Sequence, residues 1–271
     1  MAIESAIELK NKHIPKSLFK YRTFDSDSNA LRNLEKDTVW LADPSTFNDP
    51  YDCVHTFQVE RLMNFDKINQ LKAAVFQSLA EDKKAEIEAA ITQTLNEEFS
   101  DIIRQTTKSI ASSFKLCSFS ERLDSTLMWA HYADYHQGFC VEYDFACLPD
   151  TDLQKRFLYP VIYTDTLLNA TEFYSKSLNG EKANNLFLSC AALCKAKDWS
   201  YESEWRLIFA NATLESAQSY PVPKPKAVYL GAKVDEHNKR ELIEICDSKC
   251  IPVFEMCLDQ TRFKLKPIPY R

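Results

Sequence analysis

Two glutamates separated by one residue, Glu202 and Glu204, form the pattern in this sequence that is best suited to chemistry. If the surrounding segment is a strand, alternation places both carboxylates and Arg206 on one face, with the carboxylates about 6 to 7 Å apart. Two carboxylates this close repel each other, which raises the pKa of one of them or attracts a cation. The competing interpretation is an exposed strand edge on which Arg206 pairs with the glutamates.

Three further polar residues lie on segments with strand character. Arg22 could hold a phosphate or a carboxylate through two hydrogen bonds, although arginines are also common on strand surfaces. Ser118 and Ser120 flank Phe119, so both hydroxyls point to one side of their strand and could brace a neighbouring site. The serines lack a GxSxG elbow, which disfavours a nucleophilic serine hydrolase.

Histidine and acidic residues offer a different chemistry, metal binding. His131 and His136 are five residues apart, which disfavours a two-histidine metal site on one helix face. Together with Asp134 they could still meet a metal at the end of a helix, and the competing interpretation is that both histidines are structural. An acidic loop offers a similar choice between turn formation and cation binding, through Asn48, Asp49 and Asp52.

Composition excludes several classes of protein. The chain has 271 residues, a net charge of −6 and three glycines, at positions 138, 180 and 231. Because GxGxxG and P-loop motifs are missing, a Rossmann dinucleotide site and a Walker nucleotide site are excluded. The acidic charge gives no broad basic footprint for non-specific nucleic-acid binding. No apolar run approaches the ~18 residues of a membrane span, so we expect a soluble protein without a targeting signal.

The nine cysteines contain no CxxC pair, but Cys190 and Cys194, like Cys246 and Cys250, have the four-residue spacing of a helix face. A redox or zinc site is one interpretation of these pairs. Buried free thiols in a reducing compartment are the favoured interpretation, and they predict a cytoplasmic protein.

The elements that must position these residues indicate a single α+β domain over residues 1–271. Between residues 63 and 110 apolar residues recur at three- and four-residue steps, which predicts a helical insert of two or three helices. Strands are predicted at 17–24, 38–42, 114–119, 138–145, 159–163, 199–209, 227–230 and 251–256. Helices are predicted at 25–34, 125–135, 165–197 and 235–246.

Four segments together resemble a widespread bacterial family catalogued as a domain of unknown function. The resemblance runs from Phe19 to about Gly231 and brings no established activity. The segments are NDPYD (48–52), CSFSER (117–122), MWAHYADYHQGFCVEYD (128–144) and WSYESEWRLI (199–208).

The order of an early-strand arginine, a Ser-x-Ser strand and a Glu-x-Glu strand also resembles, more distantly, the ADP-ribosyltransferases. This resemblance implies NAD as the cofactor, no metal, and small mixed or antiparallel sheets that form a cleft. It implies that Arg22 contacts an NAD phosphate or ribose and that Ser118 and Ser120 brace the cleft. Glu204 would hold the oxocarbenium-like ribose, and Glu202 would assist or position the acceptor. The implied cofactor-binding set also includes Tyr21, Trp129, His131 and Tyr132.

Such an enzyme is expected to be a bacterial toxin or an anti-phage defence effector that modifies a macromolecule, either protein or nucleic acid. An antitoxin or another regulatory protein is a further expected partner, and a membrane is not. Two other hypotheses stay open: a non-enzymatic binding module, and a metal-assisted hydrolase or nuclease that uses Asp49, Asp52, His131, His136 and Glu204. The identity of the acceptor, the oligomeric state and the role of the 63–110 insert also stay open.

Overall fold

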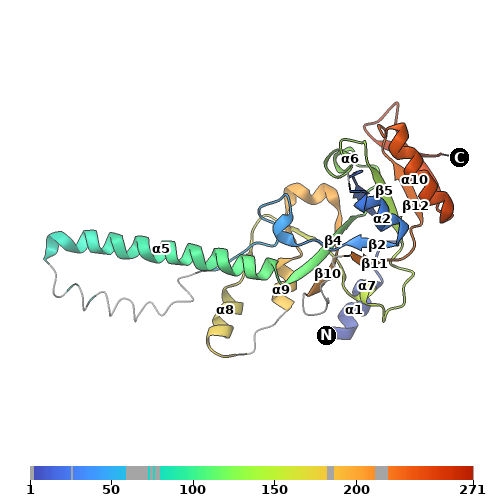
Figure 1. The fold of residues 1–271 in the computed structure, drawn as a ribbon. Coiled ribbons are helices and arrows are strands. Elements are labelled where there is room, and N and C mark those ends of the chain that lie inside the picture. Colours follow the sequence, from blue (N-terminus) through green and yellow to red (C-terminus); the bar gives the residue numbers. More distant parts are fainter. Residues whose placement is uncertain are drawn as a thin grey trace.

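An eight-stranded mixed sheet forms the centre of the computed structural model, which describes residues 3–25, 27–58, 73, 76, 80–181, 186–210 and 219–270 (Figure 1). The strand order is β14-β13-β12-β5-β1-β4-β10-β6. Its strands are β1 (Leu18–Arg22), β4 (Phe114–Ser120), β5 (Phe139–Tyr143), β6 (Leu158–Pro160), β10 (Glu204–Ala210), β12 (Ala227–Leu230), β13 (Val253–Leu258) and β14 (Leu265–Pro269). Neighbouring strands are antiparallel except β12 and β13, which α10 (Glu236–Ser248) connects. The predicted α+β class is confirmed.

The sheet consists of two blocks that meet at one position. β1 pairs with β5 along its whole length, and β4 pairs with β10 along its whole length. Between the blocks, β1 and β4 share a single register pair, Phe19 with Ser120. The two blocks therefore part beside this pair. The resemblance to ADP-ribosyltransferases implied small sheets that form a cleft; the structure instead has one large sheet whose two blocks separate between β1 and β4.

Alternation along β4 and β10 gives these strands two different faces. One face joins the largest core together with α2 (Asn29–Glu35) and α10, through Cys117, Phe119, Trp205, Leu207 and Phe209. The register of the two strands places the polar side chains together on the opposite face, at Ser118, Ser120, Glu204 and Arg206. The smaller helix α6 (Thr126–Tyr132) packs on that side against β1, with Trp129 fully buried.

Three two-stranded sheets and several short helices surround the main sheet. The paired strands are β2 (Thr38–Trp40) with β11 (Ser219–Pro221), β3 (His55–Thr56) with β8 (Leu168–Asn169), and β7 (Ile162–Thr164) with β9 (Cys194–Ala196). The helices are α1 (Ile3–Asn11), η1 (Pro44–Thr46), α7 (Leu153–Arg156), α8 (Thr171–Leu178), α9 (Leu186–Ala191) and η2 (Lys197–Glu202).

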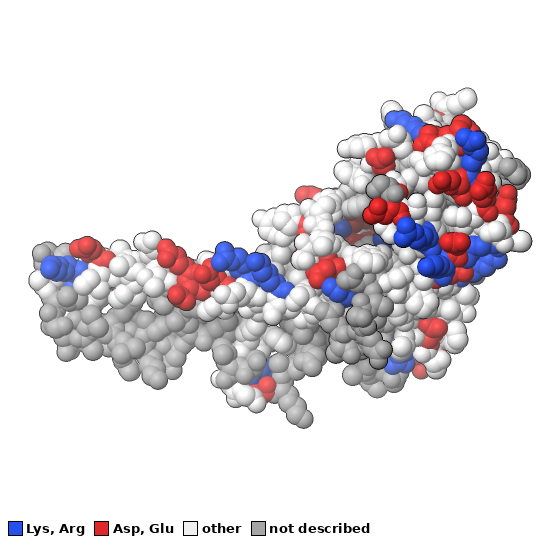
Figure 2. Space-filling view, viewed as in Figure 1, with Lys and Arg blue, Asp and Glu red and all other residues white. Residues whose placement is uncertain are grey.

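The longest helix, α5 (Glu81–Ala111), projects from the rest of the chain (Figure 1). It confirms the helical prediction over most of the 63–110 insert, while most of residues 63–79 lie outside the described part. On the face shown in Figure 2, acidic and basic side chains of described residues are interspersed rather than gathered by sign. No described helix is both long and apolar enough to cross a bilayer.

Three of the predicted elements are wrong in part. The first half of the predicted strand at 199–209 belongs to η2, and β10 begins only at Glu204. The predicted strand at 159–163 divides at Val161 into β6 and β7, which belong to different sheets. The predicted helix over 165–197 contains α8 and α9 but also the strands β8 and β9, while residues 182–185 lie outside the described part. Tertiary pairing overrides the local apolar spacing here. The single-domain organisation stays a prediction.

The segment between α6 and β5 is shaped by its backbone. Asp134, Tyr135 and His136 are all left-handed, with φ of 44°, 51° and 73°. A Cβ on Gly138 would lie 2.1 Å from the carbonyl oxygen of Arg22, so only glycine fits between this turn and β1. The turn therefore fixes α6 against β1.

All nine cysteines are free.

Candidate functional site

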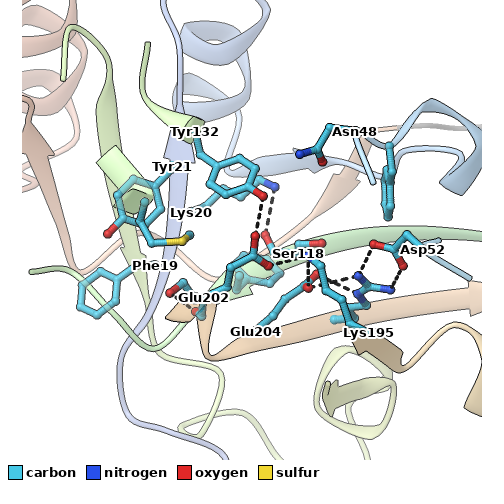
Figure 3. A pocket seen from close by; sticks show the side chains of 15 residues that line it. Phe19, Lys20, Tyr21, Asn48, Asp52, Ser118, Tyr132, Lys195, Glu202 and Glu204 are labelled. Carbon is cyan, nitrogen blue, oxygen red and sulfur yellow. Dashed lines mark hydrogen bonds and ion pairs between the residues drawn. The ribbon is translucent and has the colours of Figure 1, made fainter. Parts of the chain in front are cut away.

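A cavity of about 190 Å³ lies where β1 and β4 part (Figure 3). Its walls come from β1, β4, β10, α6, the loop after η1 and the β9–η2 segment, so residues far apart in sequence converge on it. The lining residues are Phe19, Lys20, Tyr21, Phe47, Asn48, Asp52, Ser118, Phe119, Ser120, Met128, Tyr132, Lys195, Glu202, Glu204 and Arg206.

Arg206, which is fully buried, is the centre of a network of charged groups at this cavity. Its two terminal nitrogens donate to the two oxygens of Asp52, each at 2.6 Å. Its Nε donates to Glu204 Oε1 at 2.7 Å, and Nη2 donates to Glu204 Oε2 at 3.1 Å. The carbonyl of Ala192 accepts a further bond at 2.8 Å. The five N–H groups of the guanidinium are thus matched by five bonds, and Arg206 ties the 49–52 loop to β10.

Glu204 is held as a permanent carboxylate. Besides Arg206, Lys195 donates to its Oε2 at 3.0 Å, and the Ser118 side chain adds another hydrogen bond. Burial opposes the charge, but the Arg206 guanidinium and the Lys195 ammonium outweigh burial and lower the pKa of Glu204 to about 2. The backbone N–H of Glu204 donates to the Tyr163 hydroxyl at 2.8 Å, and this bond fixes the start of β10.

Glu202 has the opposite electrostatic environment. Its Oε1 accepts from the Tyr132 hydroxyl at 2.5 Å, and its Oε2 accepts from Lys195 at 2.5 Å. Burial raises the pKa of Glu202, and the negative charge of the neighbouring Glu204 raises it further. The Lys195 ammonium lowers it, but the pKa of Glu202 remains above its ordinary value. Two nearby carboxylates with opposite pKa shifts are typical of acid–base and glycosyl-transfer sites.

The two serines of β4 contact the two glutamates in different ways. Ser120 Oγ donates to the backbone carbonyl of Glu202 at 2.5 Å, while Ser118 contacts the Glu204 carboxylate. The Ser118 carbonyl in turn accepts from Lys20 Nζ at 2.9 Å, across the opening between β1 and β4. The Ser-x-Ser strand therefore connects β1 to both glutamates.

Three of the predicted cofactor residues do not line the cavity. Arg22, at the end of β1 opposite Phe139, is not among the lining residues. Trp129 is fully buried, donates to the Leu123 carbonyl at 2.8 Å and packs edge-on against Tyr21, so it has no free face for stacking. His131 lies exposed on α6, with its ring 6.2 Å from that of Tyr201. Tyr21, Tyr132 and both serines are brought together as expected.

The route by which Glu202 reaches the site differs from strand alternation. Glu202 ends η2, Ser203 is left-handed with φ of 45°, and β10 begins only at Glu204. The alternative of an exposed strand edge is wrong, because Glu202, Glu204 and Arg206 are 3%, 4% and 0% exposed and β10 lies between β4 and β6.

Sequence reasoning missed Lys195 and Lys20. Lys195 lies in β9 at the end of the apolar run from Cys190 to Ala196, where a lone lysine could have signalled a buried partner. Lys20 lies two residues before Arg22 and carries no local signal that separates it from a surface lysine.

The predicted metal ligands do not converge. Among the described residues no group of three or more histidine, cysteine and acidic side chains is placed to hold a metal ion. Both oxygens of Asp52 accept from Arg206, and His136 belongs to the left-handed turn before β5. Asp49 instead caps its own loop, accepting from the Tyr51 backbone N–H at 2.9 Å.

Fold and cavity together define an α+β protein with a buried pair of glutamates held by one lysine and one arginine. Residues 128–207 match the model of a family described as a protein of unknown function, DUF2971, and this confirms the resemblance to an unknown-function family. The match extends from α6 into β10 and includes Tyr132, Lys195, Glu202, Glu204 and Arg206. Comparisons with curated proteins and with solved structures find no match.

Proposed function

We propose that this protein uses NAD and transfers ADP-ribose to a macromolecule. The observation that carries the proposal is the buried pair Glu202 and Glu204, with opposite pKa shifts, in a cavity braced by the Ser-x-Ser strand. The three strands that the resemblance requires, β1, β4 and β10, are neighbours in the sheet. The Ser-x-Ser and Glu-x-Glu motifs meet at the cavity, whereas Arg22 lies outside it, so two of the three ordered motifs support the interpretation as one site.

Glu202, rather than Glu204, is the carboxylate available to a substrate. A carboxylate has about four lone-pair positions. The hydrogen bonds to Glu204 from Arg206, Lys195 and Ser118 occupy these positions. Glu202 accepts only two described bonds, from Tyr132 and Lys195, so it can also accept a ribose hydroxyl.

The raised pKa of Glu202 gives this carboxylate a catalytic advantage. It means that the ionised form is incompletely compensated in the empty site. When the bond from ribose to nicotinamide breaks, positive charge develops on the ribose and compensates the Glu202 carboxylate. The interaction is stronger in the transition state than in the ground state, which is the condition for rate acceleration. Glu204 and Arg206 then act by holding Lys195 and Glu202 in position.

The size of the cavity limits which part of NAD enters. Pockets that enclose whole drug-sized ligands measure about 300 to 1,000 Å³, and this cavity measures about 190 Å³. We propose that the nicotinamide riboside end enters the cavity, while the adenosine end stays outside. The acceptor would approach the ribose from the open side of the cavity, and the exposed Asn48 is one of the lining residues it could contact.

A macromolecular acceptor fits the role of a toxin or an anti-phage effector acting in the cytoplasm, held silent by an antitoxin or another regulatory protein. Because the net charge is −6, a protein acceptor is favoured over non-specific contact with nucleic acid. Incubation with labelled NAD and cell extract, followed by protease or nuclease digestion, distinguishes the two acceptor classes.

Nicotinamide release from NAD by the purified protein, with and without cell extract, tests the proposal. The wild type should release nicotinamide, and Glu202→Gln should lose at least about a hundredfold in rate. Glu142→Gln is a matched control, because Glu142 is also buried and accepts from a tyrosine, Tyr229 at 2.6 Å, and from a lysine, Lys226 at 3.0 Å, away from the cavity. Equal loss in both variants, or no release by the wild type, would contradict the proposal and leave a binding module.

A further inference from the structure

The carboxylates of the cavity are buried, and the more exposed polar residues that line it include one cation. Asp52, Glu202 and Glu204 are each at most 9% exposed, and their oxygens accept from Arg206, Lys195 and Tyr132. The lining polar residues that keep accessible surface are Lys20, Asn48, Ser118 and Tyr132. The hydroxyl protons of Ser118 and Tyr132 already bond Glu204 and Glu202. The donors that remain for a ligand are those of Lys20 and the Asn48 amide, and they suit an acceptor oxygen.

Lys20 is the only cation of this accessible set. Its side chain crosses the opening between β1 and β4, and its ammonium donates to the Ser118 carbonyl at 2.9 Å (Figure 3). An ammonium carries three N–H donors, and with the Cys117 sulfur as a second, weak partner at least one donor remains for a ligand.

Lys20 lacks the carboxylate partner that the more deeply buried lysines Lys195 and Lys239 have. Lys195 pairs with Glu202 at 2.5 Å and Lys239 with Glu255 at 3.0 Å. Among the described residues, no carboxylate lies within ion-pair distance of Lys20. Burial lowers the pKa of its ammonium, and the nearby Arg22 charge acts in the same direction. A cation in this setting gains from an anion that enters the cavity.

We infer that Lys20 holds an anionic oxygen group of the cavity's ligand, either a phosphate or a carboxylate, and that Arg22 does not. This assignment replaces the arginine expected from the sequence with the basic residue of β1 that lines the cavity. If the ligand is NAD, the anionic group is its diphosphate. Only this identification of the group rests on the proposed function.

Calorimetric titration of the full chain with inorganic pyrophosphate, and separately with succinate, tests the inference. At least one anion should bind the wild type, and the one that binds more tightly identifies phosphate or carboxylate as the preferred group. Lys20→Met should weaken that binding by about tenfold or more, the effect of one charge-assisted hydrogen bond. Arg22→Met is the matched control and should leave the affinity unchanged. Lys20→Arg keeps the positive charge and should bind the anion. Binding by this variant would show that the loss of affinity in Lys20→Met comes from the missing charge and not from misfolding.

An independent readout is the Lys20 ammonium itself, followed by NMR of labelled lysine. Anion binding should raise the pKa of Lys20 in the wild type. Binding of neither anion, or weakening by Arg22→Met but not by Lys20→Met, would overturn the inference. If pyrophosphate binds through Lys20 but no nicotinamide is released from NAD, the inference stands and the proposed function fails. If nicotinamide is released from NAD at the same rate by the wild type and by Lys20→Met, the proposed function stands and the inference about Lys20 fails.

Discussion

Replacing Glu204 by glutamine should lower the stability of the protein at neutral pH, whereas replacing Glu202 by glutamine should not. The two residues are two positions apart, equally buried and both bonded to Lys195, so the two variants control for each other. Glu204 has a pKa of about 2 in place of the ordinary 4.5. At 1.36 kcal/mol per pKa unit, the ionised carboxylate contributes about 3 kcal/mol to the free energy of unfolding at neutral pH.

The pH range of this contribution follows from its sign. Because the pKa of Glu204 is lowered on folding, its contribution is complete above pH 4.5 and is lost as the pH falls towards 2. The pKa of Glu202 is raised on folding, so its ionisation weakens the folded state as the pH rises. Glu202→Gln should therefore leave stability at pH 7 unchanged or higher, since the amide can still bond Lys195 through its oxygen and Tyr132 through its nitrogen.

Urea unfolding at pH 7 and at pH 3 measures both effects. Glu204→Gln should lower the urea midpoint at pH 7 by about 1 M, for a slope of about 3 kcal/mol per M, and by less at pH 3. Glu202→Gln should not lower the midpoint at pH 7. Equal losses in the two variants, or a larger loss for Glu202→Gln, would refute the assignment of Glu204 as the permanently charged anchor.

Three further predictions concern neighbouring residues. Arg206→Met should lower the free energy of unfolding by about 3 to 5 kcal/mol, because the buried Asp52 would lose its ion-pair partner and Glu204 would keep only Lys195 and Ser118; Arg104→Met, at an exposed pair with Asp101, should leave the melting temperature in place. Tyr132→Phe removes a hydrogen bond to the ionised Glu202, so the acid limb of the pH–rate profile for nicotinamide release should move to higher pH. Gly138→Ala should destabilise the protein by about 1 to 3 kcal/mol or more in a urea melt, because its methyl group would meet the Arg22 carbonyl; an unchanged midpoint would contradict the tight packing at β1.

The local part of the site was predictable from the sequence. Alternation within a strand needs only neighbouring residues, so it placed Ser118 with Ser120, and Glu204 with Arg206, on one face of their strands; that the two pairs share a face follows from the register of β4 and β10. Apolar spacing likewise predicted the class of the fold and most elements of the main sheet.

The remainder of the site depends on contacts between distant segments. Asp52 and Arg206 are 154 positions apart, and nothing local marks them as partners. Glu202 reaches the cavity through a left-handed Ser203 rather than by alternation. The sequence pattern of β1 does not show which of Lys20 and Arg22 faces the cavity. The opening between β1 and β4 depends on how the strands pair, and the pattern of a single strand does not contain this information.

A crystal structure of the protein with a non-hydrolysable NAD analogue tests the central claim most directly. The account predicts the nicotinamide riboside end in the cavity between β1 and β4, with a ribose hydroxyl within hydrogen-bond distance of Glu202 and the diphosphate beside Lys20. An analogue bound at another surface, or a cavity left empty at saturating analogue, would contradict it.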